Sequence, residues 1–152
     1  MGQRTLSDRE RRYLALFEDV TGATGRDCVV SDDDGDGDGG DDDGRVLLVV
    51  KPGEMGQAIG PGGQNVRQLE EKLGADVKLV EDADTAADFV ANALAPAAVY
   101  NVTISETDDG VVAYAEVDDA DRGVAIGADG RNIDEARRLA RRHFDVDDIQ
   151  LT

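Results

Sequence analysis

The sequence predicts an α+β protein built from two copies of one αββααβ unit, and three observations support this. Two nine-residue phrases, AIGPGGQNV at 58–66 and AIGADGRNI at 125–133, match each other. Matching residues lie 67 positions apart at four places, which pair Gly56 with Gly123, Ala58 with Ala125, Gly60 with Gly127 and Asn65 with Asn132. Helical and strand-like segments follow the same order around both phrases. A constant offset of this kind indicates an internal repeat.

In the first copy, Ser7 and Glu10 have the spacing of a capping box, and apolar residues at helical intervals follow them. This pattern predicts a helix over 7–20 that ends at Gly22. The segments after it predict, in order, strands at CVV (28–30) and RVLLVV (45–50), a short helix at EMGQAI (54–59), a helix over 65–73 and a strand at DVKLV (76–80).

The second copy repeats this order. It predicts a helix at 85–95, strands at 98–105 and 111–117, a short helix at 121–126, a helix over 132–143 and a closing strand at 145–151. Asp109-Gly110 between the two strands favours a hairpin turn. We therefore expect a first domain at 1–81, including an acidic hairpin loop at about 31–44, and a second domain at 82–152.

The composition is strongly acidic. The chain of 152 residues has a formal net charge of −18, and it contains thirteen arginines but only three lysines. Such a surface resembles that of a cytoplasmic protein from a salt-accumulating halophile, since in molar salt the Debye length is only ~3 Å and self-repulsion is screened. The hydrophobic content of 40% is enough for a core.

Eight aspartates between 32 and 43 raise the alternative of a calcium site. Asp32, Asp34, Asp36 and Gly37 match the start of an EF-hand loop. The match then fails, because Gly39 replaces an apolar residue, Asp43 replaces the bidentate glutamate, and no helices are predicted on either side. We expect a solvated charge run and no metal site.

Other classes of protein find little support in the sequence. The single cysteine, Cys28, excludes an internal disulfide and is expected to be a buried thiol. No signal-peptide core or apolar segment of ~18 residues is present, so we expect a cytoplasmic protein without membrane contact. No nucleophile–base pair is evident, and His143 is expected at a helix end, so we expect neither an enzyme nor a cofactor.

The repeated phrases contain two glycine loops, the first loop at 60–63 and the second loop at 127–130. Glycines between two helices allow close backbone approach, and the N–H groups that open the second helix attract anions. A nucleotide P-loop would need Gly-Lys-Ser/Thr, and a dinucleotide fold would need a strand running directly into the glycines. Helix–Gly-x-x-Gly–helix inside an αββααβ unit is the arrangement of the KH domain, which clamps about four nucleotides of single-stranded RNA.

The segments GQAIGPGGQNVRQLEEKLG and GVAIGADGRNIDEARRLARRHFDVDDI, with LSDRERRYLALFEDVTGAT and NALAPA, resemble the tandem KH domains of NusA-like transcription factors, above all the short archaeal form. The resemblance covers nearly the whole chain outside the acidic tract. It implies two KH domains of type II topology, an extended path for single-stranded RNA and a role in transcription termination or antitermination. It also implies RNA polymerase or a transcription complex as a further partner.

The loops depart from the Gly-Lys-Gly-Gly pattern that is usual in that family. Neither loop has a lysine, and Asp129 places an anion in the second loop. Two interpretations remain open: the second loop has lost its hold on RNA, or backbone donors replace lysines in molar salt, where counterion release contributes less. We expect the RNA-binding residues to be Gly60, Pro61, Gly62, Gly63, Gln64, Arg67, Gly127, Ala128, Asp129, Gly130, Arg131 and Arg138.

Several neighbours of the loops have competing interpretations. Arginines 131, 137, 138, 141 and 142 crowd one helix, where they can pair with nearby carboxylates or form an RNA track. Asn65 and Asn132 suit helix capping as well as RNA contact. We expect Ile59 and Ile126 to face the core, although such residues can contact bases in KH grooves.

A second function class also stays open. The same scaffold would serve as a protein-interaction module that docks on RNA polymerase or ribosomal complexes, with loops that no longer bind RNA. An aromatic stacking platform is not expected, because the chain has no Trp and only 4% aromatic residues.

Overall fold

A computed structural model describes residues 5–30 and 45–152 of the chain. The acidic tract, with the hairpin-loop and calcium interpretations attached to it, lies outside the described residues. The described chain divides into two compact units, an N-terminal unit over Thr5–Asp82 and a C-terminal unit that begins at Ala83 and ends at Thr152.

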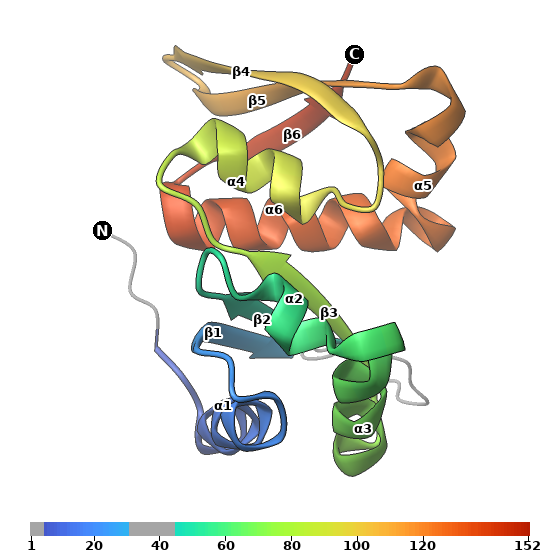
Figure 1. Ribbon diagram of the computed structural model, residues 1–152. Coiled ribbons are helices and arrows are strands. Elements are labelled where there is room, and N and C mark those ends of the chain that lie inside the picture. The colour runs from blue at the N-terminus through green and yellow to red at the C-terminus, as the bar shows by residue number, and fades with distance from the viewer. Residues whose placement is uncertain (1–4, 31–44) are drawn as a thin grey trace. The chain divides into compact units, whose positions relative to one another are not determined.

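The N-terminal unit has the predicted αββααβ order (Figure 1). Its elements are α1 (Asp8–Thr21), β1 (Gly25–Val30), β2 (Arg45–Val50), α2 (Met55–Ile59), the short 3₁₀ turn η1 (Pro61–Gly63), α3 (Gln64–Leu73) and β3 (Asp76–Glu81). The strand order is β1-β2-β3, and β2 pairs antiparallel with β1 and parallel with β3. The strand β3 is therefore an edge of this sheet.

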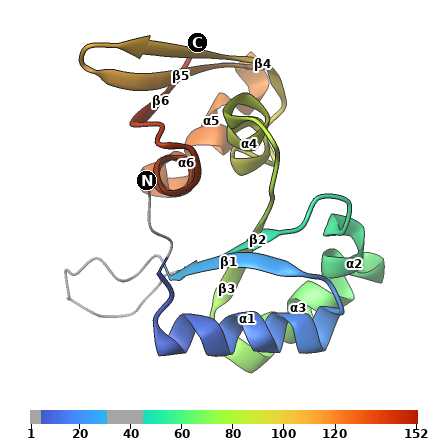
Figure 2. The ribbon, with the colours of Figure 1, turned by 90° about the vertical axis from the view of Figure 1, so that its left-hand side faces the viewer.

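Helix α1 begins and ends as its sequence predicts. The Ser7 hydroxyl accepts from the Glu10 amide at 3.1 Å, the Glu10 carboxylate accepts from the Ser7 amide at 3.0 Å, and Gly22 ends the helix with φ 77°. One face of α1 buries Phe17 completely. Helices α1 and α3 cover the same face of the sheet (Figure 2). The core between them contains Phe17, Ala23, Cys28, Val46, Leu48, Val50, Ala58 and Leu69.

The C-terminal unit repeats this architecture. Its elements are α4 (Ala86–Ala93), β4 (Val99–Thr107), β5 (Gly110–Val117), η2 (Asp119–Asp121), α5 (Arg122–Ile126), η3 (Ala128–Gly130), α6 (Arg131–Phe144) and β6 (Asp148–Leu151). Strand β5 is central, antiparallel to β4 and parallel to β6. The predicted α+β fold of two αββααβ units is confirmed.

Helices α4 and α6 pack together beneath the second sheet. Phe89 of α4 is fully buried, and its ring lies 5.2 Å from the His143 ring and 5.3 Å from the Phe144 ring, measured between centroids. Leu139 of α6 and Ile149 of β6 are also fully buried. His143 thus lies at the C-terminal end of α6, as expected, where it is half-buried and its ring stacks on Phe89.

The β4–β5 hairpin forms where predicted, but its turn lies one residue earlier than the Asp-Gly signal indicates. Thr107 pairs with Gly110, so Asp108 and Asp109 form the loop. Only Gly110 takes a positive φ, at 133°, since neither aspartate does. A type I′ turn needs positive φ at both central residues, so the glycine is used after the turn and not within it.

Candidate nucleic-acid interface

The first loop has a backbone that glycine makes possible. Helix α2 ends at Gly60, whose φ of 78° and ψ of 168° belong to a region open almost only to glycine. The chain then makes the η1 turn, with Gly62 at φ 61° and Gly63 at φ 78°. Pro61 and Gly62 are exposed at the tip of the loop. The loop is therefore a double turn that joins α2 to α3.

The second loop repeats this backbone closely. Gly127 has φ 80° and ψ 172°, and Gly130 has φ 77°. Asp129 occupies the position of Gly62 and takes the same left-handed conformation, at φ 56° and ψ 26°. Aspartate is one of the few side chains that tolerate this conformation. The change from glycine to aspartate thus alters the charge of the loop while keeping its shape.

Both loops open a helix that no side chain caps. The cap residues Gly63 and Gly130 have no side chain, and neither α3 nor α6 has a side-chain cap hydrogen bond at its start. The amides of Gly63 and Gly130 donate within their turns, to the carbonyls of Gly60 at 3.0 Å and Gly127 at 3.1 Å. A phosphate would therefore meet the remaining first-turn amides, where the positive end of the helix dipole lies.

In each unit one asparagine links the two helices that flank the loop. Asn65 donates through Nδ2 to the Gln57 carbonyl at 2.9 Å, and Asn132 donates to the Ala125 carbonyl at 3.1 Å. Both acceptors belong to the short helix before the loop. The expectation that these residues cap their own helices is thus replaced by another role: each ties the short helix to the long one across the loop.

The prediction that Ile59 and Ile126 face the core is wrong. These side chains are 39% and 40% exposed, whereas the preceding Ala58 and Ala125 are fully buried. Successive residues of a helix point about 100° apart, and in both of these short helices it is the alanine that faces inward. Val124 is also exposed, at 45%. Each loop therefore has an exposed isoleucine at its entrance, which could contact a base.

The cations lie at different places in the two units. Exposed Arg67 reaches back from α3, and its Nη1 donates to the Gly62 carbonyl at 2.8 Å. Gln64 is exposed beside it, and Arg131 is half-buried at the start of α6. Arg138 is exposed further along α6 and forms no hydrogen bond or ion pair with the described part of the chain.

Other arginines of α6 take part in packing, as the first of the two interpretations expects. Arg137 forms ion pairs with Asp134 at 2.9 Å and Asp148 at 2.8 Å, and it donates to the Ile149 carbonyl. Arg141 donates to the Asp147 carbonyl at 2.8 Å. These contacts fasten β6 to α6. The pairing of Arg137 with Asp148 could not be read from the sequence, because eleven positions separate the two residues.

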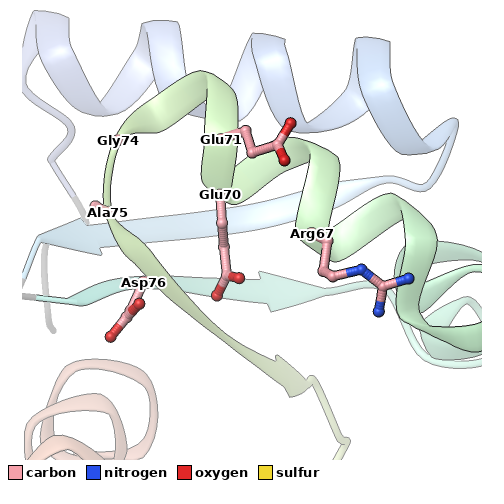
Figure 3. Close-up of a pocket in the computed structure, with 6 residues that line it drawn as sticks. All are labelled: Arg67, Glu70, Glu71, Gly74, Ala75 and Asp76. Carbon is pink, nitrogen blue, oxygen red and sulfur yellow. The ribbon is translucent and has the colours of Figure 1, made fainter.

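A pocket of about 400 Å³ lies beside α3 and the start of β3. It is lined by Arg67, Glu70, Glu71, Gly74, Ala75 and Asp76 (Figure 3). The carboxylate of Glu70 accepts a hydrogen bond from the Val77 amide at 2.9 Å. In Figure 3 the guanidinium of Arg67 lies apart from the carboxylates of Glu70 and Asp76. These carboxylates were not among the site residues predicted from the sequence.

One carboxylate in each unit anchors the chain ahead of the first strand, and neither was predicted. Glu54, just before α2, accepts from the Thr24 amide at 2.6 Å, and Asp121, just before α5, accepts from the Ala98 amide at 2.7 Å. The bond from Thr24 lowers the pKa of Glu54 below its usual value. Both residues precede the short helix of their unit, so they help to position the two loops.

Among residues 5–30 and 45–152, no helix is long and apolar enough to cross a membrane. Within the same residues, no group of three or more His, Cys, Asp or Glu side chains could hold a metal ion.

Comparisons with known proteins agree with the two-unit architecture. Residues 12–86 match the KH domain family, and residues 86–152 match the family described as NusA-like second KH domain. The crystal structure of APE1850 superposes with a TM-score of 0.78 and 27% identity, covering 97% of this chain and 100% of that one.

Relatives of known sequence extend over the whole chain. "Probable transcription termination protein NusA" of Halococcus morrhuae is 60% identical, and that of Halobacterium salinarum is 59% identical, each over 97% of both chains. The protein of the same name from Methanocaldococcus jannaschii is 30% identical over 99% of this chain and 76% of its own length. The first two organisms are halophilic archaea, in agreement with the halophilic character predicted from the composition. The chain therefore belongs to the archaeal NusA-like family of proteins with two KH domains.

Proposed function

We propose that the protein binds single-stranded RNA and acts in transcription termination or antitermination. The observation that carries this proposal is the pair of matching loops, each leading into a helix without a side-chain cap. An exposed isoleucine lies at the entrance of each loop. Phosphate at the helix entrance and a base on the isoleucine would together hold a nucleotide without an aromatic platform.

The residues proposed to line the RNA path are those predicted from the sequence, in domains proposed at 1–81 and 82–152. They are Gly60, Pro61, Gly62, Gly63, Gln64, Arg67, Gly127, Ala128, Asp129, Gly130, Arg131 and Arg138. The exposed side chains of Ile59 and Ile126 join them. Membership of the NusA-like family favours this function over a docking module with inactive loops.

RNA polymerase or a transcription complex is the protein partner that this function implies, and the cytoplasm is the compartment. No catalytic role is proposed. The relatives are named transcription termination proteins, and this name supports the role in transcription without specifying the RNA.

Fluorescence anisotropy with a labelled single-stranded RNA tests the proposal, at KCl concentrations where circular dichroism shows the protein to be folded. The variant Pro61→Asp/Gly62→Asp places two carboxylates at the tip of the first loop. Asp129 shows that aspartate fits the backbone of position 62. We expect a loss of affinity of at least about tenfold, because like charges that face each other oppose binding.

The matched control adds the same charge elsewhere. Arg12→Gln/Ala15→Asp also changes the net charge by two, on the exposed side of α1. Its affinity should stay close to that of the unmodified protein. If both double variants bind RNA as tightly as the unmodified protein, the first loop has no part in binding and the docking function gains support.

A further inference from the structure

The two long helices carry opposite charges at equivalent positions. Residues 67, 70 and 71 of α3 are Arg, Glu and Glu, whereas residues 134, 137 and 138 of α6, each 67 positions later, are Asp, Arg and Arg. The loop tips differ in the same sense, with Gly62 in the first loop and Asp129 in the second. The fold is repeated, but its charge pattern is inverted.

In the N-terminal unit the cation lies at the loop. The Arg67 guanidinium is 2.8 Å from the Gly62 carbonyl, and no carboxylate is part of the loop. Arg67 therefore supplies, from the first turns of α3, the positive charge that a loop lysine would otherwise provide. A phosphate at the first loop would meet both this guanidinium and the helix entrance.

In the C-terminal unit the loop is flanked by anions. Asp129 is exposed at its tip, and Asp134 lies close behind it, with Oδ2 only 3.7 Å from the position that a Cβ on Gly130 would take. Asp134 forms an ion pair with Arg137, but Arg137 also forms an ion pair with Asp148 and donates to the Ile149 carbonyl. The charge of Arg137 is therefore shared among groups inside the unit. A phosphate at the second loop would face Asp129, and the neighbouring Arg131 is half-buried and already takes part in an interaction of its own.

Among the described residues of this unit, an arginine without a hydrogen bond or ion pair lies further along α6. Arg138 is exposed and forms no ion pair with a described residue. It is eight residues past Gly130, whereas Arg67 is four residues past Gly63. At 1.5 Å per residue, these positions lie roughly 12 Å and roughly 6 Å along their helices from the loop.

We propose, on the basis of the proposed RNA-binding function, that the two units hold the RNA backbone at different places. The first loop with Arg67 holds a phosphate in the N-terminal unit. In the C-terminal unit Arg138 makes the phosphate contact, and the second loop holds none. The second loop then serves to shape its unit and to present Ile126 to a base.

The salt dependence of RNA binding tests this division, because each phosphate contact on a single strand contributes about 0.7 to the slope of log affinity against log salt. We expect Arg67→Gln and Arg138→Gln each to lower this slope by about 0.7 and to weaken binding several-fold. Arg12→Gln, an exposed arginine of α1, is the matched control and should leave the slope unchanged.

An aspartate added to each loop gives the direct comparison. Pro61→Asp and Ala128→Asp alter equivalent positions, 67 residues apart, and both are exposed. We expect Pro61→Asp to weaken binding about tenfold and Ala128→Asp to weaken it much less, because the second loop holds no phosphate. Circular dichroism of each variant checks that the fold is retained.

The outcomes separate this inference from the function on which it rests. If the unmodified protein binds no single-stranded RNA at any salt concentration, the proposed function fails. If it binds RNA, but Ala128→Asp weakens binding as much as Pro61→Asp, or Arg138→Gln leaves the slope unchanged, the division between the units is wrong while the function stands.

Discussion

The first and second loops have nearly the same backbone and opposite electrostatics. Gly60 and Gly127 share φ values of 78° and 80°, and an asparagine from the following helix ties each loop to the preceding one. The residues at the loop tips differ, with Gly62 in one unit and Asp129 in the other. The first turns of the following helices differ too, with Arg67 in α3 and Asp134 in α6. The shape of this loop therefore depends on its glycines and its asparagine, and the charge at its tip can change without changing that shape.

The units also differ in how firmly each loop is embedded. Asn132 is buried, at 7% exposure, and also donates to the Leu94 carbonyl at 3.4 Å, whereas Asn65 is half-buried. A Cβ on Gly127 would lie 2.7 Å from the Asn132 main-chain nitrogen, whereas the three atoms nearest to a Cβ on Gly60 all belong to the Asn65 side chain. The loop without a cation is the more tightly built of the two.

Replacing the first glycine of each loop should have the largest effect. Gly60→Ala should cost about 1–3 kcal/mol, because its backbone conformation is open almost only to glycine. Gly127→Ala carries the same cost and also forces a methyl group onto main-chain atoms, which cannot rotate away as a side chain can. We expect thermal unfolding to show a greater loss of stability for Gly127→Ala. Equal losses would mean that the second loop is no more tightly built than the first.

Removing the asparagines should have the next largest effect. Asn132→Ala leaves the carbonyls of Ala125 and Leu94 without this donor in a buried site, at a cost of about 1–3 kcal/mol. Asn65→Ala removes a bond at a more exposed site and should cost about 0.5–1.5 kcal/mol. Denaturant unfolding measures both. Gln68→Ala, an exposed residue of α3, serves as the control and should change stability little.

The smallest effect concerns the carboxylate that precedes each short helix. The Thr24 amide lowers the pKa of Glu54, so the folded protein binds this proton less readily than the unfolded chain. The stabilisation is therefore present above the unfolded pKa and is lost as pH falls through the lower folded value. We expect Glu54→Gln to reduce the loss of thermal stability on acidification.

The matched control for this titration is Glu71→Gln, which changes an exposed carboxylate that forms no hydrogen bond with the described residues. Its melting temperature should follow the same pH dependence as that of the unmodified protein. A Glu54→Gln variant that also follows this dependence would show that the bond to Thr24 contributes nothing to stability.

The sequence was sufficient for the features that rest on local chemistry. The capping box of Ser7 and Glu10, the ends of α1 and α3 at Gly22 and Gly74, and the order of elements in both units depend on residues close together in the chain. The offset of 67 residues is enough to locate both loops in the sequence. Backbone preference and hydrophobic period act over a few residues, so a linear pattern can reveal them.

The orientation of side chains beside the loops required tertiary structure. Because Ile59 and Ile126 are apolar, the sequence favoured a core position for their side chains. In the structure it is the preceding alanine that is buried. In the five-residue helices α2 and α5 the alanine is the buried residue, and the isoleucine that follows it lies on the exposed side. Asn65 and Asn132 likewise bind carbonyls of the preceding helix, a choice that depends on how two helices meet.

The repeated fold, the two glycine loops and the absence of the lysine usual in such loops can all be read from residue identity and spacing. Which charged side chains remain available for binding depends on contacts that form only in the folded protein. Arg137 and Arg138 are neighbours of the same type, yet strand β6 brings Asp148 and the Ile149 carbonyl to the first and leaves the second exposed. The reason is that a charge acts through what surrounds it, and folding brings together groups that are distant in the chain.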